Sequence, residues 1–89
     1  MKVFKFYSGE FYYAYSGLNE QIAKEQLFED IGEMQIDKVE EIPKSEWDAE
    51  IINMWEDNDL EQDPYQVSIR DNMIGESATL IFTNDLSQF

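Results

Sequence analysis

The chain has 89 residues, enough for one small domain with a single hydrophobic core. It holds 20 Asp and Glu against 6 Lys and Arg, no His and no Cys, and its net charge is −14. This composition excludes disulfides, thiolate metal sites and catalysis by His or Cys, and the shortage of cations argues against direct binding to nucleic acid or anionic membrane.

Apolar residues form 43% of the chain and aromatic residues 15%, which favours a folded domain over a disordered acidic tail. The N-terminal segment alternates apolar and charged residues, and no apolar run approaches the roughly 18 residues of a membrane span. This pattern predicts neither a secretory signal nor a membrane helix. We expect residues 1–89 to form one domain of a cytoplasmic protein.

Two aromatic-rich strands are predicted at residues 2–7 and 11–16, joined by a turn in which Gly9 supplies the positive φ of a tight hairpin. Alternation places Phe4 and Phe6 on one face of the first strand. On the second strand it groups three more aromatic residues on one face: Phe11, Tyr13 and Tyr15. Pairing these faces predicts a buried aromatic layer.

A helix is predicted from about residue 20 to residue 31, with Asn19 as its N-cap and Gly32 as the glycine that ends it. Its apolar stripe is made of Ala23, Leu27, Phe28, Ile31 and Met34. On the outer side a ladder of like charges follows at helical spacing: Glu25, Glu29 and Glu33. Such pairs repel one another by about 0.2 to 0.5 kcal/mol each.

A third strand is predicted at residues 36–42, ending before Pro43. Behind it, Ser45 to Asp48 has the form of a capping box. Apolar residues then recur at the helical period, which predicts a second helix with both tryptophans in the core: Trp47, Ile51, Met54 and Trp55. An acidic loop follows and is closed by Pro64.

The remaining chain predicts a fourth strand at residues 65–69, a turn at residues 71–76 and a fifth strand at residues 78–83. The Leu80 to Phe82 run indicates burial on both faces of that last strand. The order β-β-α-β-α-β-β predicts an α+β domain with a mainly antiparallel sheet and two helices packed on one of its faces.

The acidic residues are concentrated in the middle of the chain. Residues 20–63 hold sixteen acids and three Lys, a net charge of −13, and eight carboxylates occur between Ser45 and Ile69 without one Lys or Arg. A surface selected only for solubility usually mixes both signs of charge. The distribution therefore favours a surface directed at a basic partner, although solubility alone remains an alternative reading.

Neither a metal site nor an enzyme is predicted. The acids at residues 57, 59, 61 and 63 alternate as in a calcium loop, but Gln62 stands where that loop needs Gly and Ser68 where it needs Glu. The serines have no His to activate them, and carboxylate pairs are the remaining acid–base material. We expect no catalytic residues, no metal and no cofactor.

The aromatic first hairpin, the second acidic block and the segment at residues 39–48 (VEEIPKSEWD) resemble small acidic proteins of bacteriophages and mobile elements. That group includes anti-CRISPR proteins and other nucleic-acid mimics. The resemblance implies an inhibitor that occupies the basic groove of a nucleic-acid-binding nuclease, such as a CRISPR effector.

Two surfaces are predicted to meet such a partner. The first combines carboxylates with uncharged anchors around the acidic loop: Glu46, Glu50, Glu56, Asp57, Asp59, Glu61 and Asp63, with Trp55, Leu60 and Tyr65. The second is the ladder of Glu25, Glu29 and Glu33. An immunity protein or antitoxin against a basic toxin, and an ordinary protein-interaction module, are the alternative functions.

Overall fold

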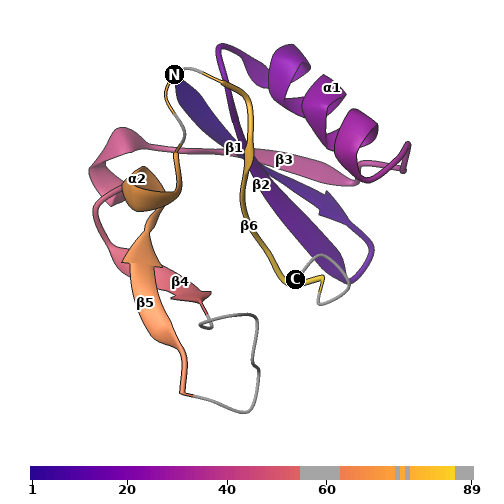
Figure 1. The fold of residues 1–89 in the computed structure, drawn as a ribbon. Coiled ribbons are helices and arrows are strands. Elements are labelled where there is room, and N and C mark those ends of the chain that lie inside the picture. Colours follow the sequence, from indigo (N-terminus) through magenta and orange to yellow (C-terminus); the bar gives the residue numbers. More distant parts are fainter. Residues whose placement is uncertain (55–62, 74, 76, 86–89) are drawn as a thin grey trace.

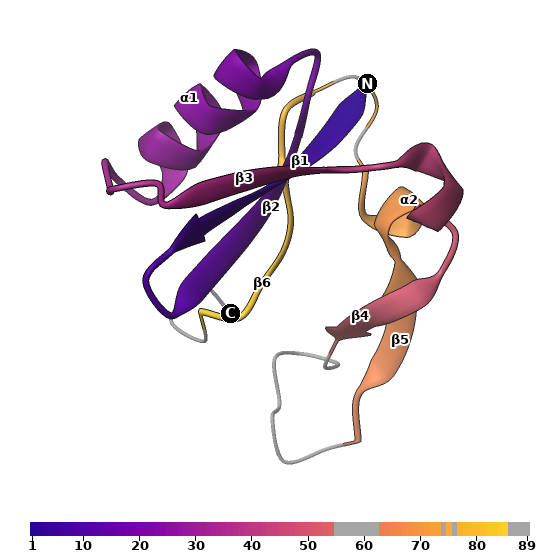
Figure 2. The same cartoon turned by 180° about the vertical axis from the view of Figure 1, so that it is seen from behind.

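The computed structural model describes residues 1–54, 63–73, 75 and 77–85. A four-stranded sheet forms its centre, with helix α1 on one face and a smaller unit, made of strands β4 and β5 and helix α2, on the other side (Figure 1). Figure 2 shows the same fold from behind, with β3 at one edge of this sheet and β6 at the other. The predicted α+β class is confirmed.

The central sheet has the order β3-β1-β2-β6, and every neighbouring pair is antiparallel. Its strands are β1 (Lys2–Ser8), β2 (Phe11–Gly17), β3 (Lys38–Ile42) and β6 (Leu80–Thr83). Phe4 lies opposite Tyr15 and Phe6 opposite Tyr13, so the predicted register of the aromatic hairpin is confirmed. Phe11 is 43% exposed, so its predicted place in the buried aromatic layer is wrong. Gly9 has a φ of 59° at the turn, as a tight hairpin requires.

Helix α1 (Glu20–Asp30) begins and ends close to the predicted residues. The Asn19 side-chain oxygen accepts a hydrogen bond from the Ile22 backbone N–H at 2.9 Å, which caps the first turn. Gly17 allows the end of β2 to approach the helix, because a Cβ at Gly17 would lie 2.9 Å from the Ala23 nitrogen. The helix therefore packs tightly on β1 and β2.

Alternation along the strands divides the core into two clusters on opposite faces of the sheet. The face under α1 holds the aromatic layer: Phe4, Phe6, Tyr13 and Tyr15 with Ala23 and Leu27. The other face packs against β4, β5 and α2 through Val3, Ala14, Trp47, Ile52, Ile69 and Ile81. β6 contributes to both clusters, through Leu80 on one face and Ile81 on the other, as predicted.

The second predicted helix is wrong. Its start forms a single 3₁₀ turn, η1 (Lys44–Glu46), and residues further along form strand β4 (Glu50–Met54), which pairs antiparallel with β5 (Tyr65–Ser68). Trp47 is buried, as expected, at 4% exposure, whereas Trp55 lies outside the described residues. The predicted helix does not form because residues 50–54 pair with β5 as a strand. Side chains of a strand alternate between its two faces, so Ile52 is buried and Asn53 is exposed.

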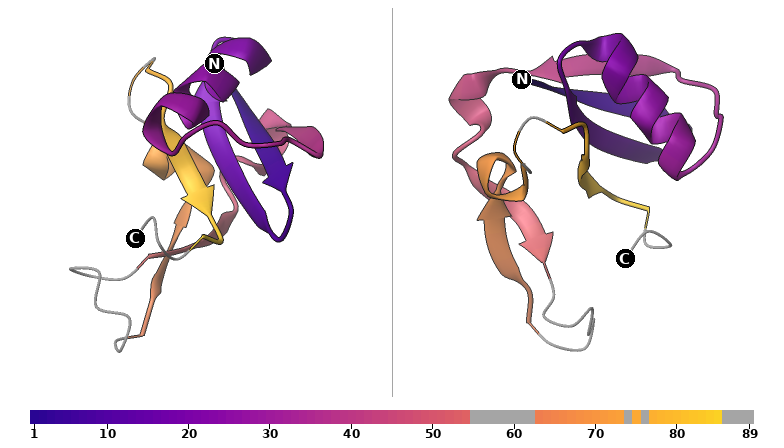
Figure 3. Two further views of the ribbon diagram at one scale, coloured as in Figure 1. Left: turned by 90° about the vertical axis from the view of Figure 1, so that its right-hand side faces the viewer. Right: turned by 45° about the horizontal axis from the view of Figure 1, so that its top comes forward.

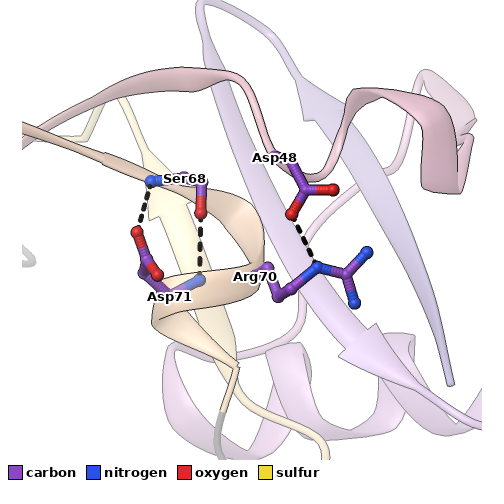
Figure 4. Close-up of polar contacts among 4 residues, drawn as sticks. All are labelled: Asp48, Ser68, Arg70 and Asp71. Carbon is purple, nitrogen blue, oxygen red and sulfur yellow. Dashed lines mark hydrogen bonds and ion pairs between the residues drawn. The ribbon is translucent and has the colours of Figure 1, made fainter.

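The second helix of the fold lies elsewhere, at α2 (Ile69–Asn72), in a segment predicted as strand end and turn. Ser68 and Asp71 form a reciprocal capping box, in which each side chain accepts a hydrogen bond from the other residue's backbone N–H at 3.2 Å (Figure 4). Ile69 is fully buried on the face of the sheet opposite α1. The two helices thus lie on opposite faces rather than on one, as the turned views show (Figure 3).

Candidate interaction surface

The predicted partner surface around the acidic loop falls largely outside the described residues: Trp55, Glu56, Asp57, Asp59, Leu60 and Glu61. Among its other members, Glu46 and Asp63 are exposed, and Tyr65 is 52% exposed at the start of β5. Glu50 begins β4 opposite Ser68.

The structure does not bring these described members together. Glu46 lies on η1, just before the Glu50 end of β4, whereas Tyr65 is paired with Met54 at the other end. Four residue steps along a strand, at about 3.3 Å each, separate those two ends by about 13 Å. Glu46 and Glu50 therefore do not lie on one flank of a second helix, because residues 50–54 form a strand.

The second predicted surface is well described. Glu25 and Glu29 are exposed on α1, on the side opposite the buried Ala23 and Leu27. Glu33 is also exposed but follows the end of the helix at Asp30. The last turn of α1 contains no basic residue, so carboxylates stand at the negative end of the helix dipole. This arrangement does not stabilise the free protein.

The basic residues are distributed unevenly. Of the chain's six, only Lys24 lies on α1, and the other five lie on β1, β3, η1 and α2: Lys2, Lys5, Lys38, Lys44 and Arg70. Three of these pair with carboxylates: Lys2 with Glu41 at 3.8 Å, Lys38 with Glu40 at 3.3 Å, and Arg70 with Asp48 at 2.7 Å (Figure 4). From residue 20 to residue 37, six acids face a single lysine.

A shallow hollow of about 280 Å³ lies between β1, β3 and η1, and its lining includes Lys5, Tyr7 and Glu40. The Lys5 ammonium lies 4.1 Å from the centre of the Tyr12 ring. Hydrogen bonds from Tyr7 and Lys38 hold the pKa of Glu40 below its ordinary value. The bond between Tyr7 and Glu40 also raises the pKa of the Tyr7 hydroxyl. Two carboxylates of the lining are paired within the chain, Glu40 with Lys38 and Glu41 with Lys2.

Two apolar side chains that the sequence does not single out are exposed at the start of α1. Leu18 is 62% exposed and Ile22 is 37% exposed. Ile22, Glu25 and Glu29 follow one another at spacings of three and four residues, which places them on one side of the helix. In the sequence, these exposed residues are indicated by their position: Leu18 and Ile22 flank the N-cap Asn19 and lie outside the apolar stripe that contains Ala23 and Leu27.

Two tyrosine hydroxyls tie the sheet to other parts of the molecule. Tyr15 donates a hydrogen bond to Asp30 at the end of α1, at 2.9 Å, and Tyr13 donates one to Asp85 at 2.8 Å. Burial, followed by the bond to Asp85, raises the pKa of Tyr13 to about 12. Burial and the bond to Asp30 raise the pKa of Tyr15 as well. Both side chains are therefore neutral hydrogen-bond donors at neutral pH.

These raised pKa values predict a loss of stability in alkali. In the unfolded chain tyrosine titrates at its ordinary pKa of about 10, so the stabilisation is complete below pH 10 and is lost as the pH rises towards the folded value of about 12. Urea unfolding between pH 8 and pH 11.5 should follow this decline. Replacing Tyr13 or Tyr15 with Phe should make the profile flatter, and an unchanged slope in both variants would contradict the assignment.

Comparison with known proteins returns no match: no protein family, no curated protein and no solved structure is similar to the chain. Across the described part of the chain, no helix is long and apolar enough to cross a membrane. Within the same residues, no three carboxylates gather closely enough to hold a metal ion.

Proposed function

We propose that the protein inhibits a basic, nucleic-acid-handling partner, such as a CRISPR effector nuclease, by placing carboxylates where that partner binds phosphates. The observation that carries this proposal is the unbalanced charge of α1 and the segment after it. From residue 20 to residue 37 six acids face one lysine, and every one of those carboxylates is exposed. The resemblance to small acidic mimics points in the same direction.

The mechanism requires no chemistry beyond electrostatics. Carboxylates on a folded scaffold attract the Lys and Arg side chains of a nucleic-acid groove, which accelerates association and excludes the true ligand. The carboxylates at residues 40, 41 and 48 already pair with lysine or arginine of this chain and contribute less. The unpaired charge is thus offered by α1 and, from the sequence, by the acidic loop.

The experiment is a displacement assay with a purified CRISPR effector, loaded with guide RNA and bound to labelled duplex DNA. The protein should release the DNA at low salt, and release should weaken steeply as salt is added. No release at low salt would overturn the proposal for this class of partner.

Two triple variants, matched in charge, locate the surface. One replaces Glu25, Glu29 and Glu33 with Lys, and the other makes the same change at the acidic loop: Glu56, Asp57 and Asp59. Circular dichroism checks that both still fold. Loss of displacement in one variant alone identifies the surface that binds. Full displacement by both variants would show that neither surface acts, and would contradict the phosphate-mimic mechanism.

A further inference from the structure

The outer side of α1 combines two features that do not stabilise the free protein. Leu18, which precedes the N-cap of α1, is 62% exposed, and Ile22 in its first turn is 37% exposed. The residues of α1 that are buried in the core beneath it are Ala23 and Leu27. Glu29 stands in the last turn, where the helix dipole is unfavourable to a carboxylate and no basic residue offsets it. Ile22, Glu25 and Glu29 thus share one side of α1, and Leu18 adds an exposed apolar side chain just before the helix begins.

The local structure holds these side chains in fixed positions. The Asn19 cap bonds to the Ile22 backbone N–H, and the close approach of Gly17 to Ala23 fixes how the chain enters the helix. Glu25 accepts a hydrogen bond from the Gln21 side chain at 2.9 Å, which orients its carboxylate. A partner would therefore meet a surface that is already ordered, which reduces the entropy lost on binding.

Charge decides which occupant fits this surface. A second copy of the chain would bring the same carboxylates against Glu25 and Glu29, and the whole molecule carries −14. A segment with apolar residues and Lys or Arg satisfies both halves of the surface. The helix dipole also sets the orientation, because cations are favoured near Glu29 at the C-terminal end of α1, whereas the apolar anchors lie at its N-terminal end.

We propose that the outer side of α1 is the docking surface for a basic amphipathic segment of a protein partner, with Leu18 and Ile22 as apolar anchors and Glu25 and Glu29 as counter-charges. This inference rests on the proposed function and names the site at which it operates. Charges at the edge of an interface mainly set the association rate, whereas buried apolar anchors slow dissociation. The anchors therefore supply the part of the affinity that salt does not remove.

The test titrates the ¹⁵N-labelled full chain with a synthetic helical peptide that carries Arg on one side and Leu on the other. A second peptide has Ser in place of Leu. The amide signals that shift should lie within residues 18–33, and the Leu peptide should bind about tenfold more tightly or better. Equal affinity for both peptides, or shifts confined to other residues, would overturn the proposal.

Variants separate the two contributions. Changing both anchors, Leu18→Ser and Ile22→Ser, should abolish the preference for the Leu peptide, whereas Phe11→Ser, at a side chain that is 43% exposed elsewhere, should retain it. Glu25→Lys with Glu29→Lys should weaken both peptides about tenfold or more. Sedimentation of the free chain provides a further check, because a dimer that the two Ser changes dissociate would make a second copy the occupant and overturn the proposal.

The peptide titration and the DNA-displacement assay fail independently. Displacement without peptide binding at α1 would leave the proposed function standing and remove this docking surface. Peptide binding at α1 without displacement would keep the docking surface and remove the nuclease as its target.

Discussion

Replacing Phe6 with Ala is expected to lower the free energy of unfolding by about 3–5 kcal/mol. Phe6 is fully buried in the central strand pair, opposite Tyr13 on β2 and Val39 on β3. Its ring lies 6.4 Å from that of Phe4, beneath α1. A domain of this size has a total stability of about 5–15 kcal/mol, so the variant should lose a large part of it.

Phe11 provides the matched control. It lies at the start of β2, next to the hairpin turn, and is 43% exposed. Phe11→Ala should therefore lower the free energy of unfolding by about 1 kcal/mol or less. Urea denaturation followed by tryptophan fluorescence measures both variants. Equal losses in the two would show that burial beneath α1 is not what makes the aromatic layer stabilising.

The first half of the fold was predictable because its signals are local. Alternation set the faces of the hairpin, Gly9 marked its turn, and Asn19 and Gly32 marked the ends of α1. Each of these features acts within a few residues of the chain. The predicted register and helix bounds therefore agree closely with the structure.

The helix predicted after Pro43 is wrong because the conformation of this segment depends on pairing with a strand that is distant in the sequence. Helical spacing of apolar residues favoured a helix, yet residues 50–54 pair with β5, which follows more than ten residues later. Ser45 lies inside the 3₁₀ turn, whose cap residue Pro43 makes no side-chain capping hydrogen bond, whereas the same pattern at Ser68 and Asp71 forms a capping box. A local motif does not tell which of two candidate sites folds as a helix.

The sequence predicts which residues of the candidate site are acidic and exposed, but not which of the chain's acids are paired with cations. Counting acids identified Glu25 and Glu29 as exposed carboxylates, and both are. The sequence did not indicate that Lys38 and Arg70 would neutralise Glu40 and Asp48, because the fold decides those pairings. The shortage of cations along α1, by contrast, is visible in the sequence as the ladder of Glu25, Glu29 and Glu33. The contrast between the paired and unpaired regions emerges only in three dimensions.

Trp47 connects the central sheet to the smaller unit, and Trp47→Ala should lower the free energy of unfolding by about 3–5 kcal/mol. The side chain is 4% exposed and packs with Val3 and Ala14 of the sheet as well as with Ile52 and Ile69 of the smaller unit. Its indole N–H donates to the Ile42 carbonyl at 3.0 Å, and its own carbonyl accepts from the Arg70 backbone N–H at 3.0 Å.

The loss should be uneven across the molecule, which hydrogen exchange measures residue by residue. Amides of β4, β5 and α2 should lose protection before those of β1 and β2, because the latter strands keep the aromatic layer on their other face. Trp47→Phe keeps an aromatic ring in the core and removes the indole N–H with part of the ring volume, so it should be less destabilising, by about 1–2 kcal/mol. A uniform loss of protection in Trp47→Ala would mean that the two units unfold as one, and that Trp47 does not act as the link between them.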